Sequence, residues 1–478
     1  MQKKTSQKSD VTERESQRIF SVEDANDIIN RVKKLDPAHA PTMIIGVIAW
    51  WQGQLHWARN RVHLAADRRD VRVTIIRNVN GSAQVATTNQ ADTESLEGAL
   101  RNSERTNLLA NQRPWPLFPV EPPRLPMPKT PVWSDATFDA TIEARGAIAQ
   151  TLSEASEQQG LLAAGYMEVR GGIHAVYNPN SAMKDEVWYR RLTQMQCSMT
   201  VRNSKGTASG WAGRSSYDWA AVDAAAVSAR TLDKCLKSMN PVAVEPGRYT
   251  TILEPQAAYQ FAFEQLLGAL NARDLAEQGL GPFALEYDSA LKLWRTKLGL
   301  KIVDERITMS HDPVDPELGV PTEPGLGPIV WIKNGVLTSM AYPREKYSLP
   351  ELNDHIPQAP RSGFRVDGGP TSREEMIAST KRGLLVTRFS PLNAIGELLV
   401  GFTRDGLWLI ENGKITKAVK NFRFLEAPLF ALNQLEQIGP AEPVFAPVVD
   451  PYLHELRPTI IPTLKVRDFS FTHMIDAV

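Results

Sequence analysis

Cysteine is scarce in this sequence, because the 478 residues contain only Cys197 and Cys235. Two cysteines exclude a disulfide framework and any zinc site built mainly from thiolates. Net charge is lacking as well, since 54 basic side chains balance 54 acidic ones. A protein that binds nucleic acid directly needs excess positive charge to neutralise phosphates, so we expect no direct nucleic-acid partner.

Long apolar segments are also missing. The longest apolar runs, such as Met43 to Trp51, are too short to cross a bilayer. Residues 1–20 are polar and mixed in charge, which predicts a disordered tail and not a secretory signal. We therefore expect a cytoplasmic protein without a membrane partner.

Proline, in contrast, is concentrated in one place. Eight prolines lie between Arg113 and Pro131, where neither a helix nor a sheet strand can continue. This boundary divides the chain into five predicted parts: a tail at 1–20, an N-terminal α/β domain at 21–112, a Pro-rich linker at 113–132, a middle α/β domain at 133–245, and a C-terminal β-rich domain at 246–478.

Hydrophobic periodicity predicts the elements of the first two domains. In the first domain we expect a helix at Val22–Leu35 capped by Ser21, strands at Met43–Trp51, Gln54–Ala65 and Val71–Asn78, a turn at Asn80-Gly81, and a helix at Thr93–Ala110. In the middle domain we expect helices at Asp135–Gln159 and Asp218–Leu236, with strands at Ala164–Arg170, Ile173–Asn178 and Gln194–Asn203.

A short echo links these two domains. Arg77-Asn78-x-x-Gly81-Ser82-Ala83 returns as Arg202-Asn203-x-x-Gly206-Thr207-Ala208. Either the two domains are related by duplication, or two unrelated hairpins both need a glycine at positive φ.

The sequence of the third domain predicts short strands around a buried helix. Apolar residues recur at helical spacing over Gln256–Ala276, and Asn334-Gly335 and Asn412-Gly413 predict hairpin turns. A capping box at Ser372–Glu375 begins another helix, which we expect Gly383 to end. The predicted fold class is α+β: an N-terminal domain of strand hairpins and helices, a possibly related middle domain, and a β-rich C-terminal domain with a buried helix.

Most motifs that carry chemistry are absent from the sequence. There is no His-Glu-x-x-His, Cys-x-x-Cys, Gly-x-Ser-x-Gly or Walker loop. The densest cluster of possible metal ligands is His311–Glu317, but its two prolines favour a rigid surface loop over a metal site.

The C-terminal half resembles the TldD/PmbA family of metallopeptidase subunits. The resemblance rests on the segment Thr371–Val386, on Gly406–Ile415 at the family's spacing, and on the hairpin Ile332–Leu337. It implies a three-part chain and a dimer. In the family, one subunit carries zinc on a helix through His-Glu-x-x-x-His and a later cysteine, and its partner subunit lacks that site.

The resemblance places the zinc helix on Gln256–Ala276 and the motif on Phe263–Gly268. Phe263 and Gly268 then replace the two histidines, Glu264 remains at the position of the general base, and no cysteine follows Cys235. Neither replacement can coordinate zinc, and Tyr249–Thr308 contains no histidine in any register. We expect no metal or other cofactor in this chain, with zinc only in a catalytic partner.

Two hypotheses follow for the function. In the first, the chain is the non-catalytic subunit of a heterodimeric peptidase that acts on unfolded peptides, paired with a zinc-bearing homologue of the TldD type. In the second, it is a peptide-binding or scaffold protein that forms a homodimer or larger homo-oligomer. Whether Glu264 keeps a catalytic role stays open, and a relocated metal site at His311–Glu317 is a weaker third interpretation.

Overall fold

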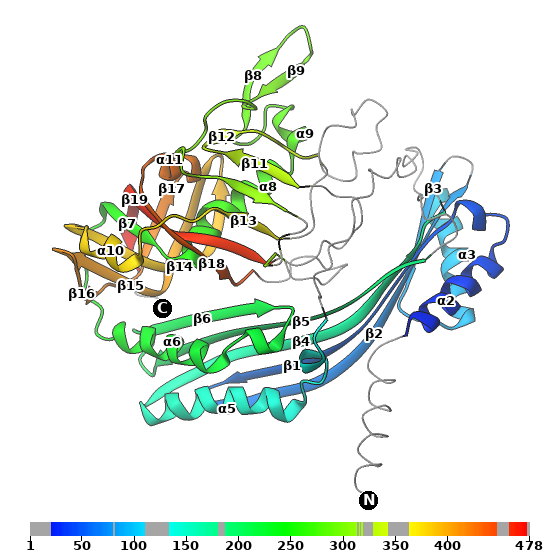
Figure 1. Ribbon diagram of the computed structural model, residues 1–478, viewed down its shortest axis with the longest axis horizontal. Helices are drawn as coiled ribbons and strands as arrows, with labels where there is room; N and C mark the ends of the chain where they lie inside the picture. Colours follow the sequence, from blue (N-terminus) through cyan, green and yellow to red (C-terminus); the bar gives the residue numbers. More distant parts are fainter. Residues whose placement is uncertain are drawn as a thin grey trace, which may run out of the picture.

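The computed structural model describes residues 21–79, 82–109, 133–179, 187–312, 315, 317–318, 328–342, 363–446 and 458–475. The predicted tail, the Pro-rich linker and the Asn80-Gly81 turn lie outside these residues. Figure 1 shows two lobes: a long curved sheet with helices, which we call the N-terminal lobe (residues 22–237), and a β-rich C-terminal lobe (residues 247–474).

A single antiparallel sheet forms the N-terminal lobe, with the described strands in the order β3-β2-β1-β4-β5-β6. The strands are long: β1 (Ile44–Ala58), β2 (Arg61–Val79), β3 (Ser82–Thr88), β4 (Leu161–Tyr177), β5 (Val187–Asn203) and β6 (Ser209–Ser216). The helical segments of this lobe are α2 (Val22–Leu35), η1 (Ala40–Thr42), α3 (Thr93–Leu109), α4 (Asp135–Phe138), α5 (Ile142–Gln158), η2 (Trp219–Ala221) and α6 (Ala224–Lys237).

The two halves of this sheet repeat the same order of elements. A helix, three strands and a second helix follow one another as α2-β1-β2-β3-α3, and then as α5-β4-β5-β6-α6. The halves meet where β1 and β4 pair antiparallel, from Ile45 opposite Tyr177 to Trp57 opposite Gly165. This arrangement favours the duplication over two unrelated hairpins. The predicted domains 21–112 and 133–245 therefore share one sheet, while their boundaries stay a prediction.

Helices cover one face of this sheet because its strands alternate in polarity. Ile45, Val47 and Val73 point toward α2, which buries Ala25 and Ile29 against them. Farther along the same face, a second cluster contains residues of α5 and α6. In Figure 1 the two pairs of helices lie at opposite ends of the sheet. No helix among the described residues is long and apolar enough to cross a membrane.

Several predicted boundaries in the N-terminal lobe were wrong. The predicted strand Gln54–Ala65 spans a tight turn, in which Arg59 and Asn60 have φ angles of 50° and 63°. The predicted strands Ala164–Arg170 and Ile173–Asn178 form one strand, β4, because Gly171 and Gly172 do not interrupt it.

These two glycines have a packing role. A Cβ atom on Gly171 would lie 2.7 Å from the ring of Phe138, and one on Gly172 would lie 2.4 Å from the carbonyl oxygen of Ala49.

Both predicted helices of the middle domain are also divided. Thr141 caps α5 after a break from α4, and Asp223 caps α6 after the short η2. Sequence periodicity also missed strand β6.

The C-terminal lobe is built around a closed ring of strands, in which β7, β14, β15, β17 and β19 pair in turn and β19 returns to β7. Ring strands are β7 (Gly247–Leu253), β14 (Arg382–Ile395), β15 (Leu398–Glu411), β17 (Phe422–Glu426) and β19 (Thr459–Met474). The other strands are β8 (Ala284–Asp288), β9 (Leu293–Thr296), β10 (Met309–His311), β11 (Ile329–Lys333), β12 (Val336–Leu337), β13 (Phe364–Val366), β16 (Lys414–Ala418) and β18 (Leu435–Val444).

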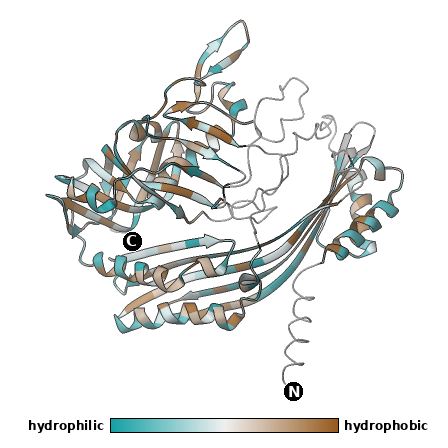
Figure 2. Cartoon of the chain, in the orientation of Figure 1, coloured by the Kyte–Doolittle hydropathy of each residue, from teal (hydrophilic) through white to brown (hydrophobic). Residues whose placement is uncertain are grey.

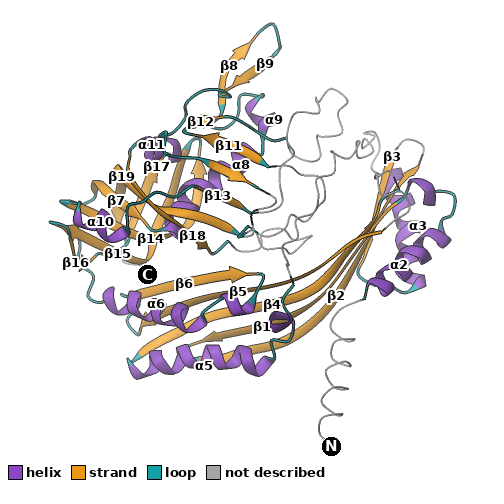
Figure 3. Cartoon of the chain, in the orientation of Figure 1, coloured by secondary structure: helices purple, strands orange, loops and turns teal. Residues whose placement is uncertain are grey.

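The helical segments of this lobe are α7 (Pro255–Ala258), η3 (Tyr259–Phe263), α8 (Glu264–Leu270), α9 (Arg273–Ala276), α10 (Arg373–Ala378) and α11 (Pro428–Asn433). Figure 3 shows how strands dominate this lobe, and Figure 2 shows hydrophobic residues concentrated in them. The predicted α+β class is confirmed.

The predicted buried helix lies in the core of the C-terminal lobe. Phe261 packs against three phenylalanines of the ring, with centroid distances of 5.0 Å to Phe469, 5.7 Å to Phe424 and 6.0 Å to Phe389. The helix is less regular than predicted, because η3 is a π-helical turn and the chain leaves the helix after Leu270. Tyr259, Phe261, Ala262 and Phe263 are all buried, on more than one side of the helix, and a search for one apolar face does not reveal this.

The hairpins of this lobe agree with the predicted turns. Asn334-Gly335 and Asn412-Gly413 have positive φ angles and connect β11 to β12 and β15 to β16. The capping box at Ser372 and Glu375 begins α10. The prediction that Gly383 ends this helix was wrong: the helix ends at Ala378, and Gly383 lies in β14. A Cβ atom there would lie 2.5 Å from the carbonyl oxygen of Thr250 on the paired strand β7.

Replacing Gly165 by alanine tests the packing between the two halves of the N-terminal sheet. The added Cβ would lie 2.5 Å from the Trp57 ring and from the carbonyl oxygen of Ser198, so we expect a loss of about 1–3 kcal/mol in unfolding free energy. Urea denaturation measures it. Gly146→Ala in α5 is the matched control, because its Cβ meets open space and should stabilise the helix by about 0.5–1 kcal/mol. Equal stability of Gly165→Ala and the wild type would contradict the described pairing.

Candidate functional site at the junction of the lobes

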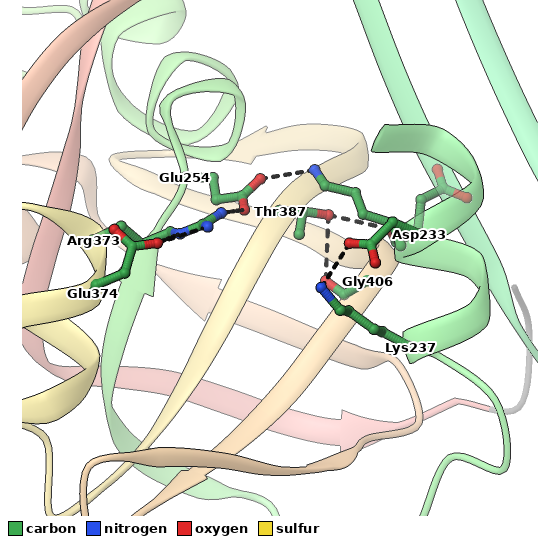
Figure 4. Close-up of polar contacts among 9 residues, drawn as sticks. Asp233, Lys237, Glu254, Arg373, Glu374, Thr387 and Gly406 are labelled. Atoms are coloured by element: carbon green, nitrogen blue, oxygen red, sulfur yellow. Dashed lines mark hydrogen bonds and ion pairs between the residues drawn. The ribbon is translucent and has the colours of Figure 1, made fainter. Parts of the chain in front are cut away.

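The helix that the family resemblance singles out begins at the junction of the two lobes. Glu254 occupies its N-cap position, and Pro255 takes the first helical position, where a missing N–H costs nothing. Glu254 accepts a hydrogen bond from Lys234 Nζ at 2.7 Å. It accepts another from Arg373 Nη1 at 3.0 Å, and Figure 4 shows Arg373 lying between Glu254 and Glu374. Lys234 lies on α6 and Arg373 begins α10, so one carboxylate connects three elements from both lobes.

Electrostatics keep this carboxylate ionised. Burial alone would raise the pKa of Glu254, but the charges and hydrogen bonds of Lys234 and Arg373 outweigh it and hold the pKa below its usual value. Arg373 also binds Glu374 at 2.9 Å, and Lys237 binds Asp233 at 2.7 Å. Those two outer carboxylates are exposed, so water screens their ion pairs far more than that of Glu254.

Further contacts hold the lobes together beside this cluster. Trp408 Nε1 donates a hydrogen bond to the carbonyl oxygen of Lys237 at 3.1 Å. The guanidinium of Arg388 stacks over the Trp211 ring at 4.4 Å and pairs with Asp405 at 3.3 Å. The junction is therefore packed from both lobes and not only joined by the connecting chain.

A cavity of about 230 Å³ lies between the lobes. Polar residues on its wall include Thr207, Ser209, Ser238, Lys420 and Asn421. This wall combines hydroxyls, an amide and an ammonium group, but it brings no nucleophile next to a general base. The cavity does not form a recognisable catalytic site.

Glu264, the candidate remnant of a general base, is the first residue of α8 and is partly buried. The Tyr259 hydroxyl donates a hydrogen bond to Glu264 Oε1 at 3.3 Å. Burial raises the pKa of Glu264, and the hydrogen bond from Tyr259 only partly opposes this. A carboxyl of this kind can exchange a proton, but the residues around it in the sequence include no histidine to hold a metal.

The two positions that the resemblance assigns to zinc ligands lie in different surroundings. Phe263 is fully buried in the core cluster of the C-terminal lobe. Gly268 is exposed, and a Cβ atom on it would meet nothing within 4 Å. Their side-chain positions offer no nitrogen, sulfur or oxygen ligand and do not share one environment, so these residues do not fit zinc.

The His311–Glu317 segment does not form a ligand set among its described residues. His311 is buried and its Nδ1 donates a hydrogen bond to the carbonyl oxygen of Gly363 at 2.9 Å; burial lowers the pKa of His311. Arg365 binds Asp315 at 2.9 Å and Glu317 at 2.5 Å. The two carboxylates thus neutralise an arginine, and the described part of the chain contains no group of three His, Cys, Asp or Glu residues that could hold a metal.

Sequence reasoning missed the cluster around Glu254. Its one local signal is the Glu254-Pro255 pair, because proline at the first helical position marks a helix start. Lys234 and Arg373, however, are 20 and 119 residues away from Glu254, and nothing in the sequence connects them.

These features define a two-lobed α+β protein whose described residues form no group that could hold zinc. Residues 246–473 match the profile of the PmbA/TldA metallopeptidase C-terminal domain, so the C-terminal lobe is of the TldD/PmbA type, as its motifs predict. No curated protein matches the sequence.

Solved structures extend the similarity to nearly the whole chain. TldE from Thermococcus kodakarensis is 16% identical, with a TM-score of 0.70, over 94% of this chain and 100% of that chain. A candidate modulator of DNA gyrase from Bacteroides thetaiotaomicron is 15% identical (TM-score 0.74; 95% and 100% covered). A candidate modulator of a DNA gyrase from Thermotoga maritima is 13% identical (TM-score 0.73; 94% and 100%). At these identities the likeness shows the fold alone.

Replacing Glu254 by glutamine tests the ionic connection between the lobes. The change removes the carboxylate that Lys234 and Arg373 share, and the Glu254 side chain is only 12% exposed. We therefore expect the free energy of unfolding to fall by about 2–4 kcal/mol at pH 7. Urea denaturation of both proteins measures it. Glu374→Gln is the control. That side chain is 70% exposed, so the free energy of unfolding should change by no more than about 0.5 kcal/mol.

The pH dependence of this loss has a defined sign. The pKa of Glu254 is depressed in the folded state. Its contribution to stability is therefore fully present above the ordinary pKa of 4.5, and it is lost as the pH falls through the folded-state pKa. The difference between wild type and Glu254→Gln should therefore shrink in acid. A difference that is constant from pH 7 to the acid limit of folding would argue against an ionic role.

Proposed function

We propose that this chain is the non-catalytic subunit of a heterodimeric, cytoplasmic metallopeptidase that acts on unfolded peptides. The proposal is supported by a family-like helix packed in the core, in which Phe263 and Gly268 stand at the positions that the resemblance assigns to zinc ligands. The helix serves the fold here, and the zinc and its hydrolytic chemistry come from a homologous partner.

Zinc in such a partner would polarise the scissile carbonyl and lower the pKa of a bound water. This chain contributes no step to that reaction. Its own contribution is structural: it completes the dimer and offers backbone to an extended substrate. The N-terminal sheet supports this second role, because β3 is the terminal strand in the order of the described strands.

A terminal strand has one row of N–H and C=O groups directed away from its neighbour. An extended peptide can pair with such a row through main-chain hydrogen bonds, which give affinity with little dependence on peptide sequence. A peptidase that receives unfolded chains of many sequences needs this kind of recognition.

Affinity purification from the native host tests the proposal. We expect a tagged form of this chain, expressed at its native level, to recover a homologue with His-Glu-x-x-x-His in about equal amount, and the complex to hold zinc. Mass spectrometry identifies the partner, and elemental analysis counts the metal. An unrelated protein with the same tag is the control. Recovery of this chain alone would overturn the proposal and leave a peptide-binding homo-oligomer.

A further inference from the structure

A small hairpin projects from the C-terminal lobe. Strands β8 and β9 pair only with each other among the described strands, and Figure 1 shows them extending away from the body of the lobe. We call residues 279–300 the arm. A hairpin of two strands is marginally stable by itself in water, so a protein that keeps one has to support it by other contacts.

The arm has a defined internal structure at its base. The Trp294 ring packs on Gly279, where a Cβ atom would lie 2.6 Å from the ring, and the backbone N–H of Trp294 donates a hydrogen bond to the carbonyl oxygen of Glu277 at 2.9 Å. Tyr287 contacts Trp294 edge to face, with centroids 6.2 Å apart. These contacts fix the orientation of the arm, so its outer side chains are presented in a fixed arrangement.

Large apolar side chains on the arm nevertheless remain in water. Tyr287 is 55% exposed and Leu291 63%, and three further leucines of the arm are about half exposed: Leu280, Leu285 and Leu300. Together with Leu275 at the base, we estimate that they expose on the order of 500 Å² of side-chain surface. The largest contiguous apolar patch of a typical monomer covers about 300–600 Å², and the summed exposure of these six side chains, which we call the patch, is of that order.

The size of the patch indicates a protein partner. A stable interface covers about 800 Å² on each partner, with an apolar centre and a polar rim. The arm supplies the apolar centre, and the exposed ion pair between Arg295 and Glu286, at 3.3 Å, lies beside it as part of a rim. The charges within Ala284–Thr296 cancel, because Glu286 and Asp288 balance Lys292 and Arg295.

Charge also distinguishes between two candidate partners of the arm: a second copy of this chain and a different chain. If two copies paired antiparallel through the middle of β8, Glu286 would lie opposite Glu286 of the other copy; like charges directly opposite are destabilising, and the exposed ion pair with Arg295 offsets this only in part. A homologue with another residue at that position does not meet this repulsion.

We infer that the arm is the docking element through which this chain binds its zinc-bearing homologue. The inference rests on the proposed function, since that function supplies the partner. It adds which surface of this chain the partner covers: the outer face of β8 and β9 with the apolar residues at the tip and base of the arm.

The test compares two variants of the full-length tagged chain in the native host. Tyr287→Glu combined with Leu291→Glu places two charges in the patch, and we expect it to recover the homologue at least about tenfold less than the wild type does. Tyr189→Glu is the matched control, because Tyr189 is 53% exposed on β5 of the other lobe. It should recover the homologue within about twofold of the wild type. Circular dichroism and thermal melting verify that both variants fold.

The outcomes separate the arm from the proposed function. If the wild type recovers the homologue and the arm variant recovers it equally well, the inference about the arm is wrong and the proposed function stands. If the wild type recovers no homologue, the proposed function fails and the inference fails with it. If the purified wild type is instead a dimer of identical chains that the arm variant makes monomeric, the arm binds a second copy and the assigned partner is wrong.

Discussion

The packing of the helical segment Pro255–Leu270 into the closed ring of strands is the constraint on which the rest of this structure depends. Phe261 fills the space between ring phenylalanines, and the π-helical turn lets neighbouring residues, Ala262 and Phe263, be buried as well. A helix held in this way is fixed by apolar contacts on several sides. These apolar contacts hold the segment in place, so Phe263 and Gly268 at the positions that the resemblance assigns to zinc ligands are compatible with an intact fold.

The same segment connects the core of the C-terminal lobe to the junction between the lobes. Its first turn is preceded by Glu254, whose carboxylate is shared by Lys234 of the N-terminal lobe and Arg373 of α10. The orientation of the long sheet is thus tied to the start of the buried helix. An ion cluster at this place costs desolvation energy, but it specifies geometry in a way that apolar contacts alone do not. The proposed role of a non-catalytic subunit depends on such geometry.

Local signals in the sequence predicted local structure well. Ser21 and Ser372 begin helices because their side chains accept backbone N–H groups, and Asn334-Gly335 and Asn412-Gly413 form hairpins because both residues accept positive φ. Gly171, Gly172 and Gly383 misled the prediction for the opposite reason: close contacts from distant parts of the chain require glycine there. The family motifs predicted the C-terminal domain, but the Glu254 cluster joins side chains that no periodicity relates. The apolar arm gave no signal either, because exposure of a leucine depends on the tertiary structure.

The central proposal is that this chain cannot build the zinc site of the family that its C-terminal lobe resembles, and that it has no hydrolytic activity of its own. The most direct measurement is elemental analysis of the purified chain after incubation with excess zinc and removal of free metal, combined with a cleavage assay on an unfolded protein substrate. The account predicts no stoichiometric zinc and no cleavage by the isolated chain. One zinc per chain together with cleavage that a chelator abolishes would contradict it.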